Sequence, residues 1–153
     1  MLHLNRLIDL SIYYYLQGLL PSRVTVVDGY PVGCTGIPED KLIIPSVAVL
    51  RLLTGTEPFE LGGADLPYLA YLLAVYAETK TQRDEIAGII QNDLKGHNIP
   101  VYDYNISIPS STLTGTFVIQ GKVNSRPMFI FPKIIEKLYW REDVTFSGSF
   151  SAK

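Results

Sequence analysis

The chain has 153 residues, of which 47% are hydrophobic and 18% are charged, and no change in composition along its length marks a second domain. Thirteen basic residues against fifteen acidic ones give a formal net charge of −2, which excludes a strong electrostatic attraction to nucleic acid or to an anionic membrane. The single cysteine, Cys34, excludes an internal disulfide and favours a reducing compartment. We therefore treat residues 1–153 as one domain with one hydrophobic core.

The N-terminal segment predicts a helix that covers most of residues 3–20 and ends before Pro21. Its apolar residues keep helical spacing, and they are Leu4, Leu7, Ile8, Ile12, Tyr15, Leu16 and Leu19. Arg6 and Asp9 interrupt the apolar pattern, and no positive leader precedes a clean apolar block. We therefore interpret this segment as a domain helix and not as a signal peptide.

Strand patterns follow the first helix. Residues 23–31, "RVTVVDGYP", predict a short strand and a turn, because β-branched residues precede an Asp-Gly pair. Residues 42–56 predict another strand, with Pro45 near its start, where no ladder N–H is required. Residues 66–78, "LPYLAYLLAVYAE", are apolar at nearly every position, so we expect a central strand buried on both faces. Gly, Pro and acidic residues in 55–67 predict a long, exposed hairpin connection between these two strands.

A second helix is predicted to begin near Thr81 and to end at Gly96. Thr79 with Gln82, and Thr81 with Asp84, each offer a hydroxyl followed three residues later by a side-chain acceptor, which is typical of a helix start. The apolar stripe that should lie on the sheet consists of Ile86, Ile89, Ile90 and Leu94. The opposite, polar side should carry Arg83, Glu85, Gln91 and Lys95.

The remaining segments predict mainly strands. Residues 99–105 and 111–123 are extended in pattern, residues 132–140 favour a short helix, and residues 143–150 alternate like an amphipathic final strand. The fold class is therefore α+β, with a mixed or mainly antiparallel sheet of about four to six strands, an N-terminal helix and a second helix packed on the sheet.

No motif for catalysis, cofactor binding or metal binding is present. His3 and His97 lie far apart, and Cys34 has no histidine near it in sequence. We interpret Cys34 as incidental, with a nucleophilic thiol in its glycine-rich loop as the alternative. Asp28 and Asp103 would make a carboxylate pair if the fold joined them, although turn capping explains each alone. We expect a protein that is not an enzyme, with no catalytic residues, no cofactor and no metal.

Aromatic side chains are frequent, with ten tyrosines, six phenylalanines and one tryptophan. Tyr and Trp are favoured at protein interfaces, and core packing is the alternative for each of them. Tyr13 and Tyr14 give the first helix more apolar surface than packing on one side requires, so either a partner covers that face or the helix is deeply buried. Phe59, beside Glu60 in the connecting loop, is either a docking anchor or a side chain folded back on the sheet. The predicted interface residues are Tyr13, Tyr14, Phe59, Glu60 and Trp140.

A helix leading to "VTVVDGYP", an apolar strand, then "VYAETKTQRDEIAGIIQNDL" and "IPVYDYN" resembles the tail terminator and related neck proteins of tailed bacteriophages. In that family a small α+β subunit has a strand followed by a helix that opens in a similar Gln-Arg-Asp-Glu or Gln-Arg-Asp-Asp segment. Gln82, Arg83, Asp84 and Glu85 stand there in this chain. The resemblance covers residues 23–105 and, more weakly, the final strand, whereas the aromatic N-terminal helix and residues 124–140 depart from it.

The resemblance implies a structural virion protein that assembles in the host bacterial cytoplasm and is located at the head–tail junction. Its subunits would close into a ring, commonly a hexamer, that ends the tail tube and meets the head connector or stopper proteins. Genomic DNA would pass through the lumen without sequence-specific binding, and no membrane would be involved. The alternatives are another neck protein, for head completion or as a tail adaptor, or a small ligand-binding or enzymatic α+β domain that uses the Cys34 loop.

Overall fold

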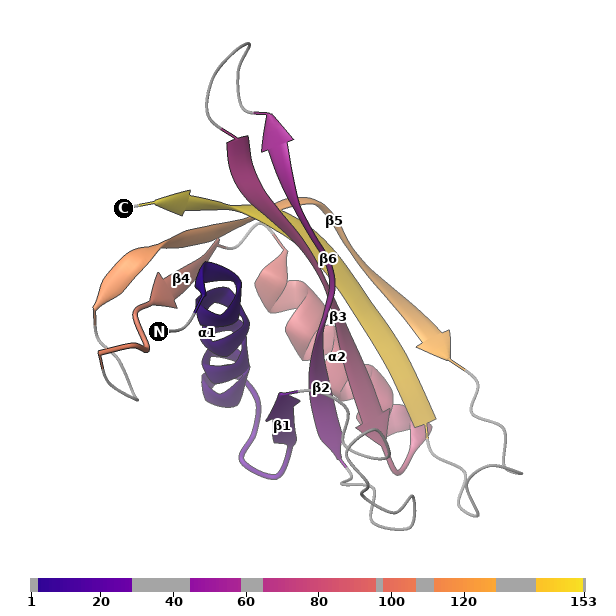
Figure 1. Ribbon diagram of the computed structural model, residues 1–153. Helices are drawn as coiled ribbons and strands as arrows, with labels where there is room; N and C mark the ends of the chain where they lie inside the picture. The colour runs from indigo at the N-terminus through magenta and orange to yellow at the C-terminus, as the bar shows by residue number, and fades with distance from the viewer. Residues whose placement is uncertain are drawn as a thin grey trace, which may run out of the picture.

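The computed structural model describes residues 3–28, 45–58, 65–95, 98–106, 112–128 and 140–152. Two helices and six strands occur in these ranges (Figure 1). In chain order they are α1 (Leu4–Leu19), β1 (Thr25–Asp28), β2 (Ser46–Pro58), β3 (Asp65–Ala77), α2 (Lys80–Leu94), β4 (Asn98–Tyr102), β5 (Leu113–Met128) and β6 (Trp140–Ala152). The predicted α+β class is confirmed.

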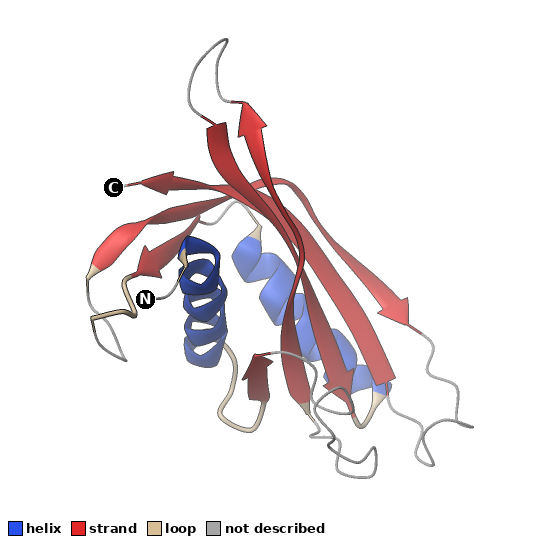
Figure 2. Cartoon of the chain, viewed as in Figure 1, coloured by secondary structure: helices blue, strands red, loops and turns tan. Residues whose placement is uncertain are grey.

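The strands form one curled sheet in the order β1-β2-β3-β6-β5-β4, and both helices lie inside the curl (Figure 2). β1 pairs with β2 in parallel, and the other four pairs of neighbours are antiparallel, so the predicted mixed sheet is confirmed. The predicted succession of strand, helix and strand over residues 66–105 is present as β3, α2 and β4. However, β6 and β5 separate β3 from β4 in the sheet.

One hydrophobic core joins the inner sheet face to both helices. At its centre the rings of Tyr71, Phe117 and Phe146 touch, with centroids 5.6 to 6.3 Å apart. Gly148 of β6 lies directly beside this cluster, where an added Cβ would come within 2.2 Å of the Val118 carbonyl oxygen and 2.9 Å of the Phe117 ring. A side chain at this position would therefore push β5 and β6 apart.

Helix α1 begins after His3, whose imidazole Nδ1 accepts a hydrogen bond from the N–H of Asn5 (3.3 Å). The helix ends at Leu20, where the backbone becomes extended ahead of Pro21, as predicted. Its apolar buried residues are Leu7, Ile8, Ile12 and Leu16. Deep burial is therefore confirmed for one stripe, whereas the stripe that carries Tyr13 and Tyr14 is only half-buried.

Helix α2 starts as its sequence predicts, one residue before Thr81. The Thr79 hydroxyl oxygen accepts a hydrogen bond from the Gln82 N–H (3.1 Å), and the Gln82 side chain accepts one from the Glu78 N–H (3.0 Å). The predicted apolar stripe is buried at Ile86, Ile90 and Leu94 and half-buried at Ile89. Gly96, the predicted terminator, lies outside the described residues.

Arg83 corrects the predicted polar side of α2. It was expected to face solvent, but it is only 5% exposed. Its guanidinium lies 5.4 Å from the ring centroid of Trp140 and pairs with Asp84, so an aromatic face and a carboxylate compensate its burial. The burial of Arg83 depends on contact with Trp140, which belongs to β6, far along the chain, so the local sequence did not indicate it.

β3 lies in the middle of the sheet, as predicted, but its burial on both faces is only partly confirmed. Ala74 and Tyr76 on its outer face are buried, whereas Ala70 and Leu72 are half-buried. The predicted long connection over residues 55–67 is wrong in length, because β2 continues to Pro58 and pairs there with Asp65 of β3. Phe59 and Glu60 lie outside the described residues. So does the short helix expected at residues 132–140, except for Trp140, which begins β6 instead.

Candidate functional site

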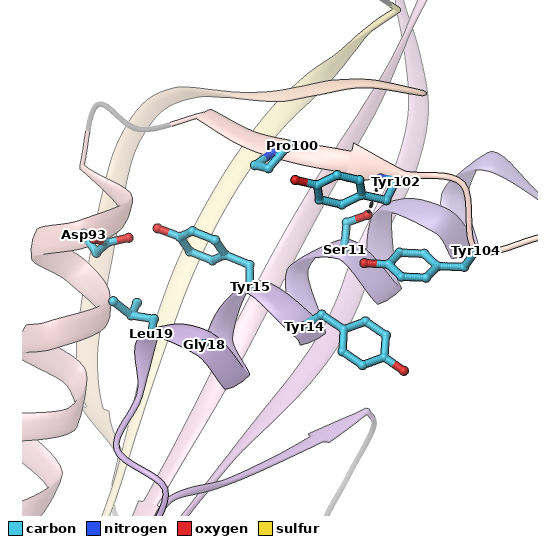
Figure 3. A pocket seen from close by; sticks show the side chains of 9 residues that line it. All are labelled: Ser11, Tyr14, Tyr15, Gly18, Leu19, Asp93, Pro100, Tyr102 and Tyr104. Carbon is cyan, nitrogen blue, oxygen red and sulfur yellow. Dashed lines mark hydrogen bonds between the residues drawn. The ribbon is translucent and has the colours of Figure 1, made fainter. Parts of the chain in front are cut away.

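A hollow of about 460 Å³ lies between α1, β4 and the end of α2 (Figure 3). Four tyrosines dominate its wall, which consists of Ser11, Tyr14, Tyr15, Gly18, Leu19, Asp93, Pro100, Tyr102 and Tyr104. We call this feature the tyrosine hollow. Its volume lies within the range of small-molecule sites in proteins.

Local geometry explains how these residues come together. Ser11, Tyr14, Tyr15 and Gly18 recur at helical spacing, so they lie on one face of α1. On β4, Ile99 and Val101 point into the core, which leaves the alternate residues Pro100 and Tyr102 on the side of the hollow.

Specific contacts hold the hollow in shape. The Ser11 hydroxyl donates to the Leu7 carbonyl (2.8 Å) and accepts from the Tyr102 N–H (3.1 Å), which fixes β4 against α1. Tyr104 stacks on Tyr14 with ring centroids 5.2 Å apart and meets Tyr102 edge-on at 6.5 Å. Burial raises the pKa of Tyr104 above its ordinary value.

Among the described residues that line the hollow, Asp93 carries a charge and none is a lysine or an arginine. In Figure 3 the hydroxyl end of Tyr15 points toward the side on which Asp93 lies. Lys95 and Lys122 line a separate hollow of about 280 Å³ beside β5. The tyrosine hollow therefore combines aromatic rings with one acidic group.

The β2 edge, residues 50–58, is a second candidate surface. β1 pairs with β2 only from Ser46 to Val49, so beyond this point β2 has β3 on one side and no described strand on the other. A β-bulge between Arg51 and Leu53 interrupts the pairing with β3. Leu52 and Leu53 are 58% and 54% exposed, so apolar side chains accompany the open backbone.

The β5 edge, residues 124–128, lies at the other end of the sheet. β4 pairs with β5 only as far as Val118, and Gln91 of α2 donates a hydrogen bond to the Val123 carbonyl (3.2 Å). After Val123, β5 has β6 on one side and no described strand on the other. Arg126, Pro127 and Met128 are exposed there.

The predicted interface residues take different positions. Tyr13 is half-buried, accepts a hydrogen bond from the Gln17 amide (2.7 Å), and meets Tyr14 edge-on. Tyr14 belongs to the tyrosine hollow, and Trp140 is half-buried beside Arg83. The interface role of these side chains stays a prediction, as it does for Phe59 and Glu60.

The candidate chemical residues have local partners. His3 caps α1, Asp28 pairs with Arg6, and Asp103 accepts a hydrogen bond from the Asn105 N–H (3.0 Å), which is the turn capping expected for an Asp in this position. Cys34 and His97 lie outside the described residues. Within the described ranges, no three His, Cys, Asp or Glu side chains gather as metal ligands would, and neither helix is long and apolar enough to cross a membrane.

The ionic cluster around the buried Asp9, whose two arginines reach the surface, was not predicted. Asp9 accepts a hydrogen bond from the Tyr71 hydroxyl (2.5 Å) and lies 3.5 Å from Arg51 and 4.0 Å from Arg6. Desolvation raises the pKa of Asp9, against the opposing effects of the Tyr71 hydrogen bond and the two arginines. The interruption of an apolar helical pattern by Asp9 was the available signal. We interpret the cluster as a polar contact that fixes α1 on the sheet.

Comparison with protein-family models and with curated proteins finds no match for this chain. The geometry of the tyrosine hollow and of the two sheet edges therefore carries the functional argument.

Proposed function

We propose that this chain is a structural virion protein of a tailed bacteriophage, which forms a ring at the head–tail junction, ends the tail tube and joins it to the head connector. The observation that carries the proposal is the open β2 edge with its exposed Leu52 and Leu53. The resemblance of residues 23–105 to tail terminator and neck proteins supports a role for this surface in subunit assembly.

A ring of identical subunits needs two different patches on each subunit, so that each copy binds the next one head to tail. The β2 edge and the β5 edge meet this requirement, because they lie at opposite edges of one sheet. The β2 edge offers backbone groups that pair with no described strand and two exposed leucines, which suit the addition of an extended segment from the neighbouring copy. The β5 edge offers Arg126 and Met128 as its exposed side chains.

The charge of the chain agrees with a collar through which DNA passes. A formal net charge of −2 gives no general attraction to the phosphate backbone, so DNA would move through the lumen without being held. A head-completion protein or a tail adaptor would share these properties, and remains the neighbouring alternative within the same assembly.

Native mass spectrometry of matched variants tests the ring. The wild-type chain should give a discrete oligomer, commonly a hexamer, whereas Leu53→Lys should give folded monomers, because a charged side chain blocks an open edge. Asn92→Lys, on an exposed part of α2, adds the same charge elsewhere and should keep the oligomer. A wild-type chain that stays monomeric at all concentrations would contradict the proposal.

A mixing experiment tests whether the contact is head to tail. Leu53→Lys keeps an intact β5 edge, and Met128→Lys keeps an intact β2 edge, so each variant alone should be monomeric while the mixture forms a heterodimer. A mixture that contains only monomers would rule out pairing between these two edges.

Loss of the chain from an infecting phage tests its place in the virion. Electron microscopy should show heads and tails that are not joined, and addition of the purified chain should restore joining. Joined particles formed without the chain would place its function outside the head–tail junction.

A ligand-binding domain is the second candidate, and the tyrosine hollow is the observation that favours it. Binding of a small molecule by a monomer, with no oligomer in native mass spectrometry, would favour this function over the ring.

A further inference from the structure

We infer that the tyrosine hollow binds an organic cation, an alkylated or primary ammonium group or a guanidinium group, by means of its aromatic rings and Asp93. This inference does not depend on the proposed ring. The hollow is formed by α1, β4 and the end of α2, whereas the ring contacts lie on the β2 edge and the β5 edge.

The composition of the wall carries the inference. Tyrosine rings present a negative face to a cation, and an aromatic lining is the usual way in which proteins bind alkylated ammonium groups. Tyr14, Tyr15, Tyr102 and Tyr104 line the hollow, and because Tyr14 and Tyr104 stack on each other, each of these two rings has one face covered by the other. An apolar molecule would use the rings alone, but Asp93 adds a carboxylate that favours a positive charge.

The charge of Asp93 is not neutralised by a neighbouring cation in the described residues. Their ion pairs do not include Asp93, and no basic side chain is among the described residues of the wall. An anionic ligand would meet the like charge of Asp93, which disfavours its binding. The wall therefore selects for positive charge.

The rings are held in place before any ligand arrives. Tyr104 stacks on Tyr14, and the backbone of Tyr102 is fixed by the Ser11 hydroxyl. Gly18 has no neighbour within 4 Å of its ideal Cβ position, so its part of the wall leaves space for a ligand. A wall that is already ordered reduces the entropy that a small ligand loses on binding.

A pair of isosteric probes tests the role of charge. Choline and 3,3-dimethylbutan-1-ol have nearly the same shape, but only choline is charged. In NMR titrations of the wild-type chain, choline should shift the resonances of Tyr15, Tyr102 and Tyr104, and its affinity should exceed that of the neutral alcohol about tenfold or more. Equal affinity for the two probes would overturn the inference.

Two further probes identify the source of the cation. N-acetyl-lysine methylamide and N-acetyl-arginine methylamide represent protein side chains, whereas choline represents a free small molecule. Tighter binding of an acetylated amino acid would assign the hollow to a partner's side chain, and tighter binding of choline would assign it to a small ligand. Either result supports a cation site, whereas no saturable binding of any charged probe overturns it.

Matched variants separate the effect of the Asp93 carboxylate on binding from effects on folding. Asp93→Asn keeps the shape of the wall and should weaken choline binding about tenfold. Tyr102→Phe keeps the ring and should keep most of the affinity, whereas Tyr102→Leu should lose it. Glu85→Gln removes a carboxylate from α2 outside the hollow and should change nothing. Unchanged choline affinity in Asp93→Asn would overturn the inference. Asp93→Asn and Tyr102→Phe still test it if Tyr102→Leu does not fold.

Discussion

Asp9 lies on the buried side of α1, where its carboxylate accepts a hydrogen bond from the hydroxyl of Tyr71 and lies near Arg51. Desolvation is the largest effect on its pKa and raises it above the ordinary value. The folded chain therefore holds this proton more tightly than the unfolded chain does. The resulting contribution to stability is complete below the unfolded pKa and is lost as the pH rises through the folded pKa.

Asp9→Asn tests this linkage, because the amide keeps an acceptor for Tyr71 but does not titrate. The free energy of unfolding of the wild-type chain minus that of Asp9→Asn should fall as the pH rises from about 4 toward 7. Urea unfolding over this range measures the difference. Burial also raises the pKa of Glu142, but this group is present in both proteins and cancels. A difference that stays constant, or rises with pH, would disprove the assignment to Asp9.

At the scale of single elements, α2 depends on a cap at its start and on an apolar stripe along its length. Thr79 and Gln82 satisfy backbone N–H groups at its first turn, and Ile90 is fully buried against the sheet. The helix has polar residues on its remaining faces, so most of its stability comes from the buried stripe.

Ile90→Asp should reduce the free energy of unfolding by about 3 to 5 kcal/mol, because it places an unpaired carboxylate in the core. Asn92→Asp, on an exposed position of the same helix, should change it by less than about 0.5 kcal/mol. Urea denaturation followed by circular dichroism measures both. Similar urea midpoints for the two variants would mean that Ile90 does not face the core.

The elements that sequence patterns predict well are those built from neighbouring residues. The period of α1, the Thr79–Gln82 cap and the apolar run of β3 are local features, and all three are present. Features that join distant parts of the chain were missed. Arg83 is buried because Trp140 covers it, and the tyrosine hollow exists because β4 packs against α1. A single sequence gives no signal for either contact.

At the scale of the whole molecule, the sheet has two edges that no described strand covers and that an assembled ring would close. Edge strands with exposed backbone groups associate with other chains unless charge, proline or a bulge prevents it. The β5 edge carries Arg126 and Pro127, and the β2 edge carries Arg51, Pro58 and a bulge. The β2 edge differs in that it also exposes two leucines, Leu52 and Leu53, so it is the more apolar of the two.

Hydrogen exchange tests closure of the β2 edge directly. If the chain forms the proposed ring, alternate backbone amides of residues 50–58 in the wild-type chain should exchange more slowly than in Leu53→Lys, because they would donate to the neighbouring copy. The amides of β3 should exchange equally in both proteins. Equal exchange along β2 would mean that another surface makes the contact.

The position of β6 between β3 and β5 has a consequence for how the chain folds. The strands β1, β2 and β3 form one half of the sheet, and β4 with β5 forms the other, and strand pairing joins the two halves only through β6. β6 is also the last of the described elements to leave the ribosome. During synthesis β3 and β5 therefore each lack a partner strand until β6 is available. We expect the nascent chain to be prone to aggregation until β6 inserts between them.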